Sequence, residues 1–229
     1  ATVSDSRTQP LSRCATCSSS WSPVSWPRVS LRSLKLSRSM NSSAPWVPER
    51  ATAAVDYVKA KARFGAANRP KDHSNPAGWL RAVDAVRRVR READKAAAMR
   101  FVNPADAYRT AQIWAEKVEK YGGGNCGEQS ALALIHLRRL GGAYPLSWVC
   151  FTNRDHAFVM VGWPLHDGWS PSEGWPPRNL PWFEDAVVCD PWDKFAAYWS
   201  DVWANYKRAY LRRLFHRDAE SDLTVWINR

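Results

Sequence analysis

The sequence predicts an α+β fold in which a buried helix carries a cysteine and packs on an antiparallel sheet, next to an N-terminal helical region. Three observations support this fold class. Helical apolar spacing dominates residues 49–121, an almost wholly apolar helix follows at about 126–140, and short β-rich runs occupy 145–152, 156–162 and 186–190. Helices followed by a group of strands are typical of α+β proteins. The chain has 229 residues, 45% of them hydrophobic, which is enough for one sizeable core.

Residues 1–46 differ from the rest in composition. The first fifty residues contain 14 Ser and seven basic against two acidic residues, without a helical or strand period, and we expect disorder there. Two interpretations stay open: a transport or secretion leader, or an over-extended start, because Met40 opens "MNSSAPWVPER" where the composition becomes ordinary. Cys14 and Cys17 form an isolated "CATC", a weak metal or redox signal. We therefore divide the chain into 1–46, a helical region at 47–121 and an α+β core at 122–229.

Three amphipathic helices are predicted in the helical region, at 49–65, 74–101 and 102–124. The second begins with Asn75 as N-cap and Pro76 at the first position, and Gly122 ends the third. The expected buried stripe of the second helix is Leu80, Val83, Val86, Ala93 and Ala97, and that of the third is Tyr108, Ala111, Ala115 and Val118. A basic stripe on the opposite face of the second helix comprises Arg81, Arg87, Arg88, Arg91 and Lys95.

The rest of the chain alternates short apolar runs with turns. A helix starting at about Cys126 has almost no polar face and should be buried on most sides. The strands at 145–152, 156–162 and 186–190 follow, with a long Pro-, Gly- and Trp-rich loop at 163–185 between the last two. We expect a final helix at 195–215 and a last strand at 222–229.

The bulk chemistry narrows the function classes. Lys and Arg outnumber Asp and Glu by 33 to 22, a formal charge of +11, which suggests acidic partners. No nucleic-acid-binding motif is visible, and no apolar run reaches the length of about 18 residues expected of a membrane-spanning helix. Five scattered cysteines do not form a disulfide framework.

Three residues form a candidate catalytic triad. Cys126 stands where the glycine-rich turn "GGGN" becomes a helix, and a helix N-terminus stabilises a thiolate. His156 stands at the start of a strand, as a possible base. Asp190 ends the next strand, as a possible orienting acid, although Asp155, Asp185 and Asp193 compete for that role. The ordinary structural interpretations are a core cysteine, a satisfied histidine and a turn-forming aspartate.

Further groups could assist the site. The Cys126 N–H could bind a developing oxyanion, and Asn125 and Gln129 are candidates for positioning the oxyanion or the substrate. The glycines before Cys126 would let the backbone approach a substrate. Cys150 and Cys189 lie inside apolar strands and are expected to be inert. No metal-ligand spacing or phosphate-binding loop occurs in the globular part, so no cofactor or metal is predicted.

The motifs "GNCGE", "DHAFVMVG" and "VVCDPW" together resemble the papain-like and transglutaminase-like cysteine enzymes, most of all their bacterial toxin and effector branch. That branch includes the deamidase of dermonecrotic toxin and the AvrPphE-type effectors. The resemblance covers about residues 115–195 and implies Cys126 as nucleophile, His156 as base and Asp190 as orienter. This chain has "HAF" where transglutaminases commonly have "HAW", which favours deamidation or proteolysis over cross-linking.

The leading hypothesis is a secreted effector that acts on a target-cell protein in the target-cell cytosol, through a thioester intermediate. It would attack a glutamine amide or a peptide bond, and an immunity protein or host activator is a possible partner. No nucleic-acid partner is expected. Two alternatives stay open: a catalytically inactive module that binds an acidic partner or a membrane through the Arg-rich helical face, or a peptidoglycan amidase.

Overall fold

A computed structural model describes residues 47–96, 104–141, 145–151, 156–163, 180, 182–206 and 211–217. The helices are α1 (Val47–Lys61), α2 (Pro76–Ala96), α3 (Pro104–Tyr121), α4 (Cys126–Leu140) and α5 (Trp199–Val202), with 3-10 turns at Pro70–Asp72 (η1) and Trp203–Tyr206 (η3). The strands are β1 (Leu146–Phe151), β2 (Ala157–Val161), β3 (Val187–Asp190), β4 (Phe195–Tyr198) and β5 (Leu211–Arg217). The predicted leader at 1–46 and the last strand at 222–229 lie outside the described residues.

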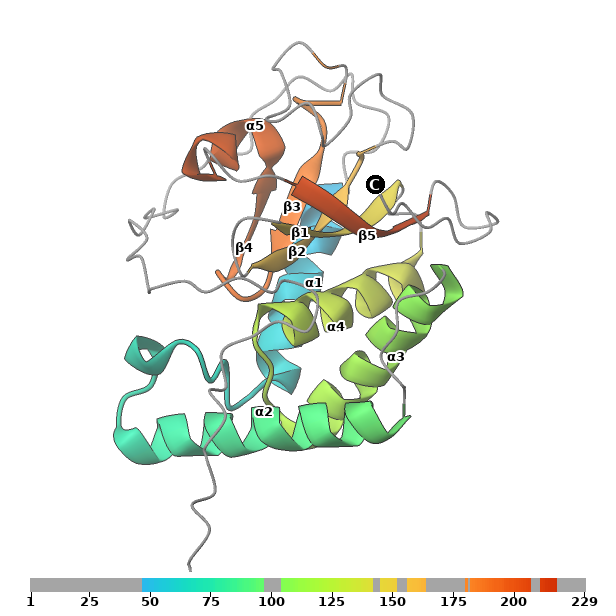
Figure 1. The fold of residues 1–229 in the computed structure, drawn as a ribbon. Coiled ribbons are helices and arrows are strands. Elements are labelled where there is room, and N and C mark those ends of the chain that lie inside the picture. The colour runs from blue at the N-terminus through green and yellow to red at the C-terminus, as the bar shows by residue number, and fades with distance from the viewer. Residues whose placement is uncertain are drawn as a thin grey trace, which may run out of the picture.

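The strands form one five-stranded antiparallel sheet with the order β4-β3-β2-β1-β5. Helices α1 and α4 pack against one face of this sheet, and α3 and α2 follow beyond α4 (Figure 1). The α+β class and the buried helix on an antiparallel sheet are therefore confirmed. Strands β1, β2 and β3 lie within one residue of their predicted bounds at each end.

Strands β1, β2 and β3 of the sheet are buried on both faces. Side chains that alternate along β1 divide between two apolar clusters, with Trp148 in the cluster toward the helices and Val149 in the other. The second cluster contains Trp163 and Trp182, which belong to the predicted loop at 163–185, and Trp199 of α5. Most of that loop lies outside the described residues.

Residues of the N-terminal helical region share the first cluster with the sheet. Ala51 and Val55 of α1 and Trp114 of α3 lie in it together with Leu132 of α4 and Val187 of β3. Residues on both sides of the predicted boundary at residue 121 therefore contribute to one core. The division of the chain at that position stays a prediction.

Two details of the helices were predicted wrongly. Leu80 was expected in the buried stripe of α2, but its side chain is 58% exposed, whereas Val83, Val86 and Ala93 are buried as expected. Leu80 is the fifth residue of α2, and the buried side chains of this helix begin two residues later, at Ala82. Ala97 falls outside the described residues.

The predicted helix at 195–215 was also wrong. Residues 195–198 form β4, only a short α5 follows, and residues 211–217 form β5. A tight turn reverses the chain before β4, with Lys194 at a φ of 68°, and β4 then pairs with β3 from Val187↔Tyr198 to Asp190↔Phe195. Aromatic residues spaced three or four apart are compatible with a helix as well as with short strands. Here pairing with β3 and β1 places these residues in strands.

Candidate active site

Cys126 begins α4 after a short connection from α3, and two glycines make this tight connection possible. Gly122 ends α3 with a φ of 77°, a conformation that suits glycine. A Cβ on Gly123 would stand 2.6 Å from the Cβ of Ala85 in α2, so only glycine fits there. Gly123 thus allows close packing on α2. The expected role of the glycines in the approach of a substrate stays a prediction.

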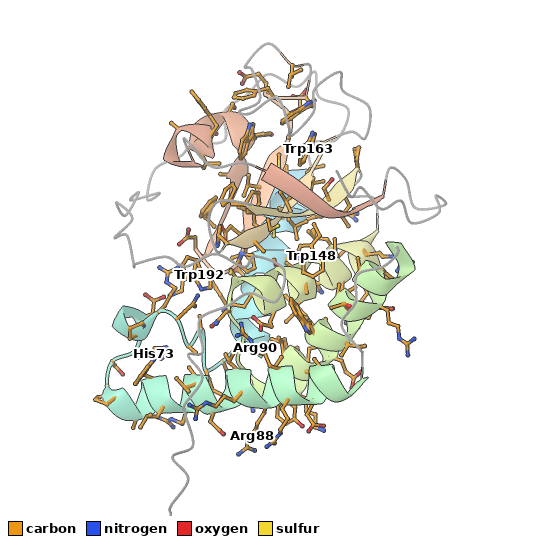
Figure 2. All side chains as sticks on the ribbon, viewed as in Figure 1. His73, Arg88, Arg90, Trp148, Trp163 and Trp192 are labelled. Atoms are coloured by element: carbon orange, nitrogen blue, oxygen red, sulfur yellow. The ribbon has the colours of Figure 1, made fainter. Side chains whose placement is uncertain are left out.

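Glu128 fixes the first turn of α4. Its Oε2 accepts a hydrogen bond from the Asn125 N–H at 3.0 Å, and Oε1 accepts one from the Arg90 Nε–H of α2 at 2.6 Å. Glu128 is 1% exposed, so its charge is held in a buried environment by these two donors. Figure 2 shows Arg90 directed from α2 toward α4. No pattern in the sequence indicates this ion pair, because Arg90 lies 38 residues before Glu128 in the chain.

Asn125 and Gln129, the two predicted positioning residues, form hydrogen bonds with the backbone around Cys126. The Oδ1 of Asn125 accepts a hydrogen bond from the Ala67 N–H at 2.9 Å. The Nε2 of Gln129 donates to the Gly124 carbonyl at 2.6 Å. Both side chains are buried. In this arrangement they hold the loop before Cys126 in place, and a direct role toward substrate stays a prediction.

His156 and Asp190 meet because of the antiparallel pairing of β2 and β3. His156 directly precedes β2 and Asp190 ends β3, and in an antiparallel pair the start of one strand lies beside the end of the other. The Nε2 of His156 lies 2.6 Å from the Oδ2 of Asp190. The imidazole is 5% exposed and the carboxylate is fully buried. The distance is that of a short, charge-assisted hydrogen bond.

Cys126 adjoins the same imidazole. Burial lowers the pKa of His156, but the Asp190 carboxylate and hydrogen bonding with Asp190 and Cys126 outweigh it and hold that pKa well above its usual value. Asp190 occupies Nε2, so Nδ1 is the ring nitrogen through which His156 can exchange a proton with Cys126. An imidazolium beside the sulfur favours the thiolate in turn. The structure therefore brings the three predicted residues together in the order thiol, imidazole, carboxylate.

The other aspartates that the sequence offered for the orienting role do not take the position of Asp190 among the described residues. Asp185 is exposed in the turn before β3, and Asp155 lies outside the described residues. Asp193 lies close to Asp190, but an ion pair with Arg69 at 2.8 Å engages its carboxylate. Burial and the Asp190 charge raise the pKa of Asp193, against the lowering effects of His156 and Arg69.

His156, Asp190 and Asp193 also meet the spacing of a metal site, since one potential ligand atom from each lies within 4.8 Å of the others. A cation there would have to part the 2.6 Å contact between His156 and Asp190 and compete with the Arg69 guanidinium for Asp193. The hydrogen bond and the ion pair explain the cluster without a metal ion.

A segment that the sequence did not indicate closes the site on one side. The connection between α1 and α2 lies against the turn after β3: the Arg69 guanidinium donates to the Trp192 carbonyl at 2.6 Å, and the Asn68 Oδ1 accepts from the Trp192 ring N–H at 3.0 Å. The Arg69 Cζ also lies 4.4 Å from the centre of the Trp192 ring. That ring in turn lies 5.0 Å from the imidazole of His156, centre to centre. Arg69 and Asn68 thus hold the Trp192 ring beside His156.

The other cysteines of the described residues lie in the core. Cys150 and Cys189 are buried in β1 and β3. The Cys189 thiol donates to the Ala51 carbonyl at 3.5 Å, and burial, with a smaller contribution from Asp190, raises the pKa of Cys189 far above its usual value. This environment opposes thiolate formation at Cys189, in contrast to the environment of Cys126.

In comparisons with known proteins, no protein-family model, no curated protein and no solved structure matches the chain. Among the described residues, none of the helices combines the length and the apolar character needed to span a bilayer. The chemistry of the site consequently rests on the arrangement of its own residues.

Proposed function

We propose that the chain is a cysteine-dependent hydrolase that works by acyl transfer, with Cys126 as nucleophile, His156 as acid and base, and Asp190 as the residue that orients the imidazole. One observation carries the proposal: a cysteine at the N-terminus of a buried helix adjoins an imidazole that is itself fixed by a buried carboxylate. Nucleophilic catalysis by a thiol needs these three groups in this order.

In the proposed reaction the Cys126 thiolate attacks the carbonyl carbon of an amide. The pair of electrons moves to the carbonyl oxygen, and the resulting oxyanion lies near the N-terminus of α4, where the Cys126 N–H and the helix dipole favour negative charge. When the tetrahedral intermediate collapses, the C–N bond breaks and the His156 imidazolium gives its proton to the leaving nitrogen. Cys126 is left as a thioester and His156 as a neutral imidazole.

Water completes the cycle. Neutral His156 takes a proton from a water molecule, whose oxygen attacks the thioester carbonyl, and the C–S bond breaks to release a carboxylic acid and the thiolate. Asp190 orients the ring of His156 and stabilises the imidazolium. The net reaction exchanges an amide nitrogen for oxygen from water.

The substrate that we propose is a protein amide, with the side chain of glutamine favoured over the peptide bond. Cys126 is 2% exposed, and a slender side-chain amide reaches a buried sulfur more easily than a folded backbone does. The resemblance to papain-like and transglutaminase-like enzymes of the toxin and effector branch supports the same choice. That resemblance and the basic, acid-poor N-terminal stretch also support export and action on a protein in the target-cell cytosol.

Mass spectrometry of target-cell proteins tests the proposal. Lysates are treated with the wild type, with Cys126→Ala and with the matched control Cys189→Ala. We expect the wild type and the control to convert specific glutamines to glutamates with release of ammonia, and Cys126→Ala to convert none. New protein termini would indicate proteolysis, and cross-linked species would indicate transglutamination. Identical proteomes for wild type and Cys126→Ala would contradict the enzymatic function.

A further inference from the structure

A second surface feature lies beside the loop that carries the nucleophile. A hollow of about 450 Å³ opens between α2, the C-terminal end of α3 and residues 63–64. Its lining contains four cationic side chains from these three segments, and we call it the basic groove: Arg63, Arg81, Arg88 and Lys120. The sequence indicated a basic stripe on α2 but could not show that Arg63 and Lys120 join it.

The positive charge of the basic groove is mostly uncompensated. Asp84 is the one acidic residue in its lining, and it pairs with Arg88 at 2.9 Å, which leaves a net charge of +3 from the four cations and this carboxylate. Among the described residues, no carboxylate forms an ion pair with Arg63 or Arg81. Arg88 is directed away from the body of the molecule (Figure 2). Such a concentration of unmatched cations favours an anionic partner.

Aromatic rings hold two of the cations in place. The Arg63 Cζ lies 4.8 Å from the centre of the Phe64 ring, and the Lys120 Nζ lies 5.1 Å from the centre of the Tyr121 ring. Both rings contribute to the lining of the groove. Cation–π contacts of this kind limit the freedom of long side chains, so that less conformational entropy is lost when a ligand binds.

The groove also has an exposed apolar margin. Leu80, which contributes to the lining, is 58% exposed, and the adjacent Trp79 is 37% exposed with its ring N–H donating to the Ala67 carbonyl. Exposed apolar side chains beside a charged hollow are typical of protein-binding surfaces. A nucleic acid would leave Leu80 without a matching contact, and the concave shape does not suit a flat bilayer.

We propose that the basic groove binds an acidic segment of a partner protein. Carboxylates of the segment pair with Arg63, Arg81 and Lys120, and an apolar side chain of the segment covers Leu80. Guanidinium groups suit this role because they bind carboxylates in a bidentate manner.

The bound segment would touch the elements that support the nucleophile loop. A Cβ on Gly122 would stand 3.0 Å from the Arg63 side chain, and Ala85 of the groove packs on Gly123. Binding itself does not depend on the proposed catalysis, so this site and the proposed function can fail separately.

Fluorescence anisotropy with labelled probes tests this site on the full chain. The probes are a peptide of Glu and Leu residues, a peptide of Lys and Leu residues, a single-stranded oligonucleotide, and vesicles containing phosphatidylserine. We expect saturable binding of the Glu–Leu peptide in preference to the other three. The double variant Arg63→Glu/Arg81→Glu should weaken it roughly tenfold or more, since each reversed charge replaces attraction with repulsion.

The matched control is Arg87→Glu/Arg91→Glu, which makes the same charge change at exposed positions of α2 outside the groove lining. We expect this control to retain most of the affinity, and Leu80→Ser to lose part of it at unchanged charge. Circular dichroism confirms folding of each variant. Equal weakening by both double variants, stronger binding of the oligonucleotide or the vesicles, or no binding of the Glu–Leu peptide would overturn the proposal.

Discussion

Replacing Glu128 tests how the start of α4 is held, and the size of the effect follows from its contacts. Glu128→Ala removes a buried carboxylate that accepts hydrogen bonds from the Asn125 N–H and from Arg90. A hydrogen bond to a charged group contributes about 1.5–3 kcal/mol, and breaking a buried ion pair costs about 3–5 kcal/mol. Because the Arg90 side chain is 24% exposed, water recovers part of its solvation. We therefore expect Glu128→Ala to lower the free energy of unfolding by about 3 kcal/mol.

Glu128→Gln separates charge from shape. The amide oxygen can accept one of the two hydrogen bonds, but the amide NH₂ then faces a second donor, so we expect a loss of about 2 kcal/mol. Urea denaturation followed by far-UV circular dichroism measures both variants. The control is Glu116→Ala, which removes an exposed ion pair with Lys117 and should cost less than about 1 kcal/mol.

A double-mutant cycle with Arg90→Met isolates the ion pair from other effects of each substitution. We expect a coupling energy of about 1.5–3 kcal/mol between Glu128 and Arg90. If Glu128→Ala lost no more stability than Glu116→Ala, or if the coupling energy were near zero, the account of how α4 begins would be refuted.

Three further predictions concern the surroundings of Cys126. Gly123→Ala should cost about 1–3 kcal/mol in thermal or urea unfolding because its Cβ would meet Ala85, and adding Ala85→Gly should restore part of the loss; a neutral effect would contradict the close approach. Arg69→Met should lower the free energy of unfolding by about 1–3 kcal/mol because Asp193 loses its ion pair, and it should slow alkylation of Cys126 because Trp192 loses the guanidinium that holds it beside His156. A loss of stability no larger than that of Arg87→Met would contradict this. Because the pKa of His156 is raised in the folded state, the stability that its protonation contributes should be complete below pH 6.5 and disappear as pH rises through the raised value; His156→Gln should abolish this pH dependence, and an unchanged dependence would contradict the assignment.

Some residues of the candidate site are marked by patterns in the neighbouring sequence, and these residues could be predicted. Cys126, His156 and Asp190 each lie at the end of an element whose type is visible in a few neighbouring residues: a glycine-rich turn before an apolar helix, and two apolar runs bounded by polar residues. Once those elements form an antiparallel sheet under a helix, the strand ends meet near the helix N-terminus. Short-range patterns therefore indicated the three residues that the structure brings together.

The parts that depend on distant contacts could not be predicted. Arg69 reaches Trp192 and Asp193 across more than a hundred residues, and no spacing within the loop around Arg69 indicates these partners. The pairing of Glu128 with Arg90 is equally non-local. The predicted helix at 195–215 was wrong for the same reason, because its apolar spacing suits a helix until pairing with β3 and β1 is considered.

The reactivity of Cys126 tests the central claim most directly. The intact protein is treated with iodoacetamide over a range of pH, and alkylation of each cysteine is followed by mass spectrometry in the wild type and in His156→Ala. We predict that Cys126 reacts faster than Cys150 and Cys189, that it does so well below the ordinary thiol pKa of about 8.5, and that His156→Ala removes this advantage. Alkylation of Cys126 at the same slow rate as Cys150 and Cys189, or a rate unaffected by His156→Ala, would contradict a thiol nucleophile paired with His156.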